Sequence, residues 1–311
     1  MIVTCGEALI DMIPEPTQAG GEGFVPHSGG AVFNSSIALG RLDADVALLT
    51  GLSTDLFGRQ LKRDLGNSNV VTSLLCYSDR PTTLAFVRLK DGQASYTFYD
   101  ENSAGRMISN ADVPELPDTT KALFFGGISL AVEPSGSTYT DLAIRVAEDH
   151  VVMVDPNIRP GFISNEQSYR YRLARLFAVA DVVKVSDEDL DWILPGDHSL
   201  DNKLTQLRSL GPPVVIMTRG KDGATAIANG EAVSVPARPV QVADTVGAGD
   251  AFSAGVLAKL SELDLLSKES VQNINSDSLQ AVLDYGIQAA AITVSRAGAN
   301  PPWKHELNNS S

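Results

Sequence analysis

Apolar runs of strand length alternate with amphipathic stretches of helix length along most of the chain. We expect strands over 2–5, 46–50, 122–125, 151–154, 182–185 and 214–218, and helices over 31–42, 55–65, 137–148, 166–179, 187–194, 199–210, 248–263 and 276–294. Strands that alternate with helices are typical of βαβ units and a mostly parallel sheet. The pattern therefore predicts one large, doubly wound α/β domain.

Two segments break this regular alternation. Residues 13–28 are rich in Pro and Gly, and the runs TTLAFVRL and SYTFY alternate apolar and polar positions around Lys90-Asp91-Gly92, a hairpin signal. Asn229-Gly230 marks a further hairpin over 223–235. We expect insertions over about 11–28 and 72–103 to form a small β-sheet lid on a single domain spanning 1–311. Ligands of such sheets bind at the carboxyl ends of the strands, so chemistry is sought in those loops.

Composition excludes several classes of function. The 311 residues include 24 basic and 38 acidic side chains, a net charge of −14, which disfavours binding to nucleic acid or anionic membranes. Cys5 and Cys76 form neither a disulfide framework nor a metal pattern, and the four histidines have no ligand spacing. No signal peptide or membrane helix is expected, so we predict a cytoplasmic protein. The P-loop, protein-kinase and dinucleotide-binding fingerprints are missing.

The segment Asp244-Thr245-Val246-Gly247-Ala248-Gly249-Asp250-Ala251-Phe252 carries the sharpest chemical signal. Its glycines permit a tight turn directly before a helix, whose first amides then point outward as an anion hole. Asp250 could act there as a general base toward a hydroxyl that attacks a phosphoryl group. The alternative is an ordinary N-cap, since Asp is favoured at that position. By itself the segment leaves both readings open.

Other polar residues follow predicted strands. Asp11 comes just after the first strand, Gly29-Gly30 precede Asn34 at a helix start, and Arg159 lies in DPNIRP after a buried strand. Arg159 could clamp a phosphate or sugar oxygens. Taken singly, each residue is better explained as part of a turn or as a surface position.

Together these segments resemble the ribokinase-like (PfkB-type) carbohydrate kinases, and most closely the fructokinases. The similar segments are CGEALID (5–11), GGAVFNSSIALGRL (29–42), GLSTDLFG (51–58), FYDENSAGRM (98–107), DPNIRP (155–160), VKVSDEDL (183–190), TRGKDG (218–223) and DTVGAGDAF (244–252). The resemblance implies a three-layer fold with helices on both faces of the sheet. It implies that Asp250 is the base and that the amides of Gly247, Ala248 and Gly249 form the anion hole. For sugar binding it implies Asp11, Gly29, Gly30, Asn34, Phe98, Arg106 and Arg159.

The resemblance also implies a nucleotide end. Ser186 and Asp189 stand where the family has an Asn-x-x-Glu motif that organises Mg²⁺, so Asp189 is expected to hold that ion through water. ATP is expected beside Ser186, Thr218, Gly220, Gly223 and Gly249. A monovalent cation, K⁺, is expected at Asp244, Val246, Thr293, Arg296 and Gly298, although Pro302 stands where some members offer a hydroxyl.

The implied activity is ATP-dependent phosphorylation of a primary hydroxyl, with fructose converted to fructose 6-phosphate. Ala31 replaces the Lys typical of ribokinases, and Asp100 stands where sugar-acid kinases place a basic residue. 2-Keto-3-deoxygluconate is therefore the second candidate, followed by ribose or a nucleoside. An inactive sugar-sensing or assembly protein of this fold is the alternative from another class. The alternating lid strands are expected to pair in a homodimer.

Overall fold

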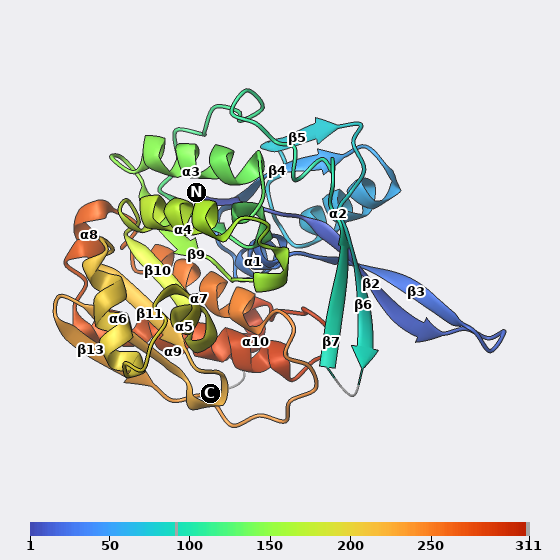
Figure 1. The fold of residues 1–311 in the computed structure, drawn as a ribbon. Helices are drawn as coiled ribbons and strands as arrows, with labels where there is room; N and C mark the ends of the chain where they lie inside the picture. Colours follow the sequence, from blue (N-terminus) through green and yellow to red (C-terminus); the bar gives the residue numbers. More distant parts are fainter. Residues whose placement is uncertain (91–92, 309–311) are drawn as a thin grey trace.

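A nine-stranded sheet forms the centre of the molecule (Figure 1). The computed structural model describes residues 1–90 and 93–308, so part of the turn expected at Lys90-Asp91-Gly92 lies outside the described residues. The strands are β1 (Ile2–Cys5), β4 (Val46–Ser53), β5 (Leu75–Ser78), β8 (Ala122–Gly126), β9 (Val151–Asp155), β10 (Val182–Ser186), β11 (Val214–Thr218), β12 (Ala224–Ala228) and β13 (Glu231–Val235). Their order is β13-β12-β11-β10-β9-β8-β1-β4-β5. Within this sheet, all strands between β5 at one edge and β11 run parallel. The predicted hairpin of β12 and β13 extends the sheet beyond β11 with antiparallel pairing.

Helices cover both faces of this sheet, which confirms the predicted three layers. One face packs against α1 (Ala31–Arg41), α2 (Leu56–Asn67), α7 (Ala248–Glu262), α8 (Lys268–Gln272) and α9 (Ser276–Val294). The other packs against α3 (Ser135–Val146), α4 (Glu166–Phe177), α5 (Asp187–Ile193) and α6 (Leu200–Ser209). Neighbouring strand residues such as Val182 and Val183 enter opposite cores, because side chains alternate along a strand. Burial on both faces explains why these strands read as continuous apolar runs.

A separate four-stranded sheet projects from the body of the molecule (Figure 1). It contains β2 (Leu9–Pro16), β3 (Glu22–Gly29), β6 (Leu84–Lys90) and β7 (Gln93–Tyr99), in the order β3-β2-β6-β7. The parallel pairing of β2 with β6 joins two segments that are distant in the sequence. We call these four strands the lid sheet. The expected second insertion began too early, at 72, because β5 pairs with β4 in the large sheet.

The remaining elements are short. They are the 3₁₀ turns η1 (Ile128–Leu130), η2 (Pro160–Phe162) and η3 (Gly220–Asp222), and the terminal helix α10 (Lys304–Asn308). Both α8 and α10 escaped the sequence pattern, because five residues are too few to display a helical period. Within the described ranges 1–90 and 93–308, no helix has the length and hydropathy that crossing a bilayer requires.

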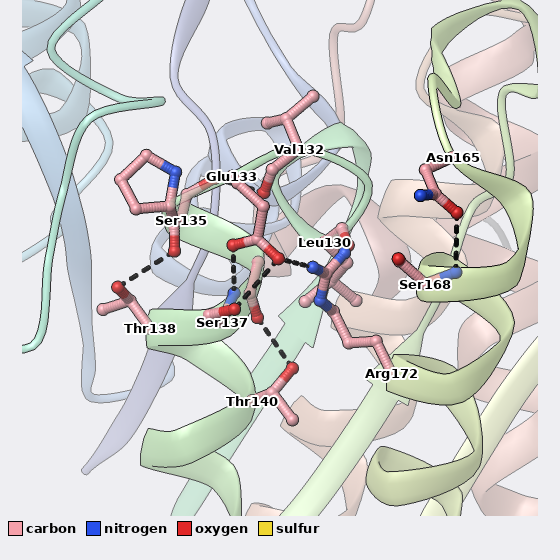
Figure 2. A network of polar contacts seen from close by, with 12 residues as sticks. Leu130, Val132, Glu133, Ser135, Ser137, Thr138, Thr140, Asn165, Ser168 and Arg172 are labelled. Carbon is pink, nitrogen blue, oxygen red and sulfur yellow. Dashed lines mark hydrogen bonds and ion pairs between the residues drawn. The ribbon is translucent and has the colours of Figure 1, made fainter.

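A polar network ties α3, α4 and η1 together beneath the carboxyl ends of the strands (Figure 2). Buried Arg172 of α4 donates to the Leu130 carbonyl at 2.6 Å and pairs with Glu133. The Glu133 carboxylate also accepts from the backbone and hydroxyl of Ser137 in the first turn of α3. These contacts hold η1 in place, and Ile128 of η1 lines a cleft at the strand ends.

Candidate active site

A cleft of about 660 Å³ opens at the carboxyl ends of the parallel strands, beside the lid sheet. This is the location expected for ligands of an open α/β sheet. Many of the residues expected in the site line this cleft: Asp11, Gly30, Asn34, Phe98, Arg159, Ser186, Asp189, Thr218, Val246, Gly247, Ala248, Gly249 and Asp250.

Asp250 lies buried in the first turn of α7, at the floor of the cleft. Its Oδ2 accepts a hydrogen bond from Asn34 Nδ2 at 2.9 Å, and its Oδ1 lies 3.5 Å from Asn157 Nδ2. Burial raises the pKa of the carboxyl to about 7, although the Asn34 hydrogen bond favours the ionised form and opposes that rise. A carboxylate with a pKa near neutrality is suited to take a proton from a hydroxyl.

The backbone before Asp250 turns sharply into α7. Gly247 is the N-cap residue with a φ of 77°, in the left-handed region that glycine adopts without a steric penalty. The amides of Gly249 and Asp250 follow in the first helical turn, where no intrahelical carbonyl accepts from them. Together with the positive end of the helix dipole, these amides give this side of the cleft a partial positive charge that suits an anion.

At the lid end of the cleft, Asp11 lies against the backbone of the Gly-Gly segment. A Cβ on Gly29 would come within 2.1 Å of Asp11 Oδ2, so only glycine leaves room for this carboxylate. Burial raises the pKa of Asp11 to about 6. Phe98 of the lid sheet also faces the cleft and meets Phe162 of η2 edge-on, with the ring centroids 4.8 Å apart. That contact joins the lid sheet to the loop that follows β9.

Asp189 has a structural task at the strand ends. Its two oxygens accept from the backbone amides of Ile158 at 2.8 Å and Ser186 at 3.1 Å, while Ser186 Oγ accepts from the Asp189 amide in a capping box. The carboxylate therefore connects the loop after β9 to the start of α5. It also lines the cleft, and each carboxylate oxygen has a second lone pair.

The remaining expected residues are those near ATP, which lie around η3, and those near a monovalent cation, which lie around the loop before α7. Thr218 ends β11 and lines the cleft, whereas Gly220 and Gly223 lie in and after η3, beyond its lining. Around the loop before α7, Asp244 accepts from the amides of Val246 at 3.1 Å and Gly298 at 2.9 Å. The Thr293 carbonyl accepts from the Arg296 amide, and the Arg296 guanidinium pairs with Glu306. The five residues expected at a monovalent cation thus lie around the contact between this loop and the end of α9.

Arg106 does not reach the cleft lining. Its Nη1 lies 3.5 Å from Asp100, and its Nε donates to the Glu133 carbonyl. Asp100 is itself buried and accepts from the hydroxyls of Thr83 and Ser103. Both residues therefore belong to the base of the lid sheet, whereas the expected contact between Arg106 and substrate stays a prediction.

Among the lining residues that were not expected from the sequence, three make contacts that help to build the site. Glu7 accepts from the amides of Ala31 at 3.0 Å and Ser129 at 3.2 Å and joins the start of α1 to η1. Asn157 contacts Asp250. Lys184 is a charged residue inside the buried strand β10. Of these three residues, only Lys184 could have been recognised in the sequence, because a charged residue within an apolar strand requires a partner.

Comparisons with known proteins agree with this geometry. The model of the pfkB family carbohydrate kinases matches residues 1–306. A fructokinase of Rhizobium leguminosarum bv. trifolii is 48% identical over 281 residues, which cover 90% of this chain and 86% of that protein.

Solved structures share the same architecture. The fructokinase of Xylella fastidiosa with bound ATP is similar with a TM-score of 0.89, at 26% identity, over 99% of this chain and 98% of that one. A fructokinase of Vibrio cholerae bound to fructose, ADP and potassium ion gives a TM-score of 0.86, at 27% identity, over 99% and 97% of the two chains. Because the family model matches residues 1–306, which are almost the whole of this chain, the chain belongs to the pfkB family of carbohydrate kinases.

Proposed function

We propose that this protein is an ATP-dependent fructokinase that phosphorylates the primary 6-hydroxyl of fructose. The observation that carries the proposal is the placement of the Asp250 carboxylate directly beside the first amides of α7. A base and an anion hole at the same helix start suit the attack of a hydroxyl on a phosphoryl group. The 48% identity to a fructokinase supports fructose as the acceptor.

In this proposal Asp250 accepts the proton of the sugar hydroxyl while that oxygen bonds to the γ-phosphorus and the bond to ADP breaks. The amides at the start of α7 stabilise the charge on the transferred group. Asp11, Asn34 and the Gly29-Gly30 backbone orient the sugar, and Phe98 with the lid sheet excludes water from it. Arg159, Thr218 and Ser186 face the phosphate and nucleotide end of the cleft.

Mg²⁺ and K⁺ are part of the proposal. Mg²⁺ in kinases is held mainly by phosphates, water and one or two carboxylates, and Asp189 fits that role through water because it lines the cleft with lone pairs remaining. The bound ion would neutralise phosphate charge. The Vibrio cholerae fructokinase was solved with bound potassium ion, and here a monovalent cation would lie at the loop of Asp244 and Gly298.

A sugar acid is a weaker candidate for the acceptor. Recognition of its carboxylate calls for a cation that is free to meet it, and the guanidinium of Arg106 is engaged by Asp100 and Glu133 instead. Arg159 is the arginine that lines the cleft in the described part of the chain. These contacts favour a neutral sugar such as fructose.

The setting of the enzyme is proposed on similar grounds. A cytoplasmic location agrees with ATP as the donor and with the unpaired Cys5 and Cys76. A homodimer through the lid sheet is supported by the exposed aromatic rings of Tyr99 and Phe24, which both pack on Phe86 and offer an apolar surface.

The direct test is ATP-dependent phosphorylation of fructose, ribose, 2-keto-3-deoxygluconate and adenosine. We expect turnover of fructose, and a fall of about 10²–10⁴ in kcat for Asp250→Ala with ATP affinity kept, because a positioned base contributes that much. Asp264→Asn, at an exposed aspartate paired with Lys121, is the control and should match the wild type. Turnover of the sugar acid alone, or an Asp250→Ala enzyme of normal rate, would contradict the proposal.

A further inference from the structure

Lys184 is a buried cation in the middle of an apolar strand. Its side chain is 5% exposed, and its Nζ donates to Asp155 Oδ2 at 2.9 Å. Burial by itself lowers the pKa of Lys184, but Asp155 and Asp189 outweigh that effect and the pKa lies above its ordinary value. The neighbouring carboxylates therefore favour the protonated ammonium.

The ammonium lies next to the anion hole. A Cβ on Gly249 would be 3.3 Å from Lys184 Nζ, so the absence of a side chain at Gly249 leaves Lys184 open toward the first turn of α7. Lys184 also lines the cleft. Since an ammonium has three N–H donors, one bond to Asp155 leaves capacity for an anionic oxygen on the cleft side.

A second contact holds this arrangement from α7. Ser253 Oγ donates to the same Asp155 oxygen at 2.9 Å, and Ser253 is fully buried one turn after Gly249. Asp155 ends β9, Lys184 lies in β10 and Ser253 belongs to α7, so three elements converge on one carboxylate. Such a cation is preorganised, because it does not have to move or lose water when a phosphoryl group arrives.

The charges around the cleft create a need for this cation. Its described lining includes six acidic side chains, Glu7, Asp11, Asp187, Glu188, Asp189 and Asp250, against the two cations Arg159 and Lys184. Arg159 is exposed, whereas Lys184 is buried beside the anion hole. Charge interactions strengthen away from water, so the buried cation is the one placed to act on a reacting phosphoryl group.

We propose that Lys184 is a further catalytic residue, whose ammonium donates to the oxygens of the phosphoryl group during its transfer, with Asp155 and Ser253 as its positioning residues. The inference rests on the proposed function, because the transferred group is the γ-phosphoryl of ATP. The new bond forms between the sugar oxygen and phosphorus, the bond to ADP breaks, and the proton goes to Asp250. Lys184 keeps all three of its protons throughout.

The first test compares two buried lysines. Lys203 is as buried as Lys184 and pairs with Asp191 at 2.7 Å, but it lies outside the cleft lining. We expect Lys184→Met to lower kcat by about 10²–10³ with KM for fructose changed less than about threefold, as for the loss of a transition-state donor. Lys203→Met should lose thermal stability and keep its kcat. Ser253→Ala, a milder change, should lower kcat about threefold to tenfold at unchanged KM.

The second test uses a readout other than turnover. ADP with aluminium fluoride imitates the transferred group, and its affinity is measured against that of ADP alone, with Mg²⁺ and fructose present. We expect wild type and Lys203→Met to bind ADP more tightly with aluminium fluoride, and Lys184→Met to bind ADP normally but lose at least about tenfold of that gain. A retained gain, or a kcat for Lys184→Met equal to that of Lys203→Met, would overturn the role of Lys184.

The two proposals can fail separately. If wild type does not phosphorylate fructose, the proposed function fails, while the aluminium fluoride measurement with ADP and no sugar still decides the role of Lys184. If wild type phosphorylates fructose and Lys184→Met keeps its kcat, the role of Lys184 fails and the proposed function stands.

Discussion

The protonation of Asp250 is the property of a single residue on which the proposed chemistry depends most. Its carboxyl is buried, its pKa is about 7, and Asn34 stabilises its ionised form through a bond of 2.9 Å. Only the ionised form can accept a proton. Because the pKa is raised, the active form is lost as the pH falls through about 7, well above the range of an exposed aspartate.

We therefore predict that kcat/KM for fructose falls below pH 7, with an acidic limb near that value. Asn34→Ala removes a hydrogen bond to the ionised form, so it should raise the pKa of Asp250 and move the limb to higher pH. Ser35→Ala is the matched control, since Ser35 contacts the Asp250 backbone carbonyl instead of the carboxylate. The measurement is the pH profile of kcat/KM for the three enzymes, and an unmoved limb in Asn34→Ala would contradict the assignment.

At the scale of elements, the site depends on contacts between the lid sheet and the loops of the large sheet. Phe98 of β7, which lines the cleft, packs against Phe162 of η2, and Arg106 joins the base of the lid sheet to the Glu133 carbonyl. Glu133 also belongs to the network of Arg172 (Figure 2). The lid sheet is thus joined to the same layer of helices that supports η1 and Glu7.

Removing the Phe98–Phe162 contact should loosen the lid sheet. An aromatic pair contributes about 0.5–1.5 kcal/mol, so Phe98→Ala is expected to raise KM for fructose roughly twofold to tenfold. Hydrolysis of ATP without sugar transfer should increase, because water enters the cleft more easily. Phe162→Ala should have the same effects, and the double variant should be little worse than either single one. Fully additive effects would show that the two rings act separately.

At the scale of the whole molecule, the net charge of −14 coexists with an anionic nucleotide. The proposed contacts resolve this opposition, since the phosphates meet helix amides, Lys184 and Arg159 within the cleft. The outer face of the lid sheet is different in character. Tyr99 is 59% exposed and Phe24 37% exposed, and both pack on Phe86. Since Phe98 faces the cleft, Tyr99 beside it faces away.

We predict that this aromatic face forms the dimer contact. Tyr99→Ser combined with Phe24→Ser should convert a dimer to a monomer in light scattering coupled to size-exclusion chromatography, because it removes the apolar area available for pairing. Tyr171→Ser changes an equally exposed tyrosine of α4, away from the lid sheet, and should leave the dimer intact. A wild-type protein that is monomeric at all concentrations would contradict the prediction.

Much of the fold could be predicted from local pattern. Strands such as β9 and β10 read as apolar runs because both faces are buried, and α2 and α4 show the helical period of a face packed on the sheet. The lid strands β6 and β7 could be predicted because apolar and polar positions alternate along them. The pairing of β5 with β4 in the large sheet could not be predicted, because a short strand has the same pattern in either sheet.

The part of the candidate site that could be expected from local sequence is the backbone turn into α7. Gly247 and Gly249 before a helix indicated an anion site, and Asp250 followed from that position. The position of Arg106 outside the cleft lining could not be predicted, because its contacts with Asp100 and Glu133 depend on the turn at the base of the lid sheet. Asn157 and Glu7 gave no local sign, since their roles depend on contacts with distant segments.

The sequence by itself determined the alternating architecture and the glycine-rich helix start, because these depend on residue types at short spacing, and the class of chemistry followed from the resemblance of several segments to one family. Only the tertiary structure decided which side chains meet. Asn34 reaches Asp250 across 216 residues, and Asp155, Lys184 and Ser253 converge from three elements. Such meetings depend on strand order and helix packing, which local spacing does not encode. Lys184, a charged residue within an apolar strand, meets its partner Asp155 only in the folded chain, and its proposed role depends on that contact.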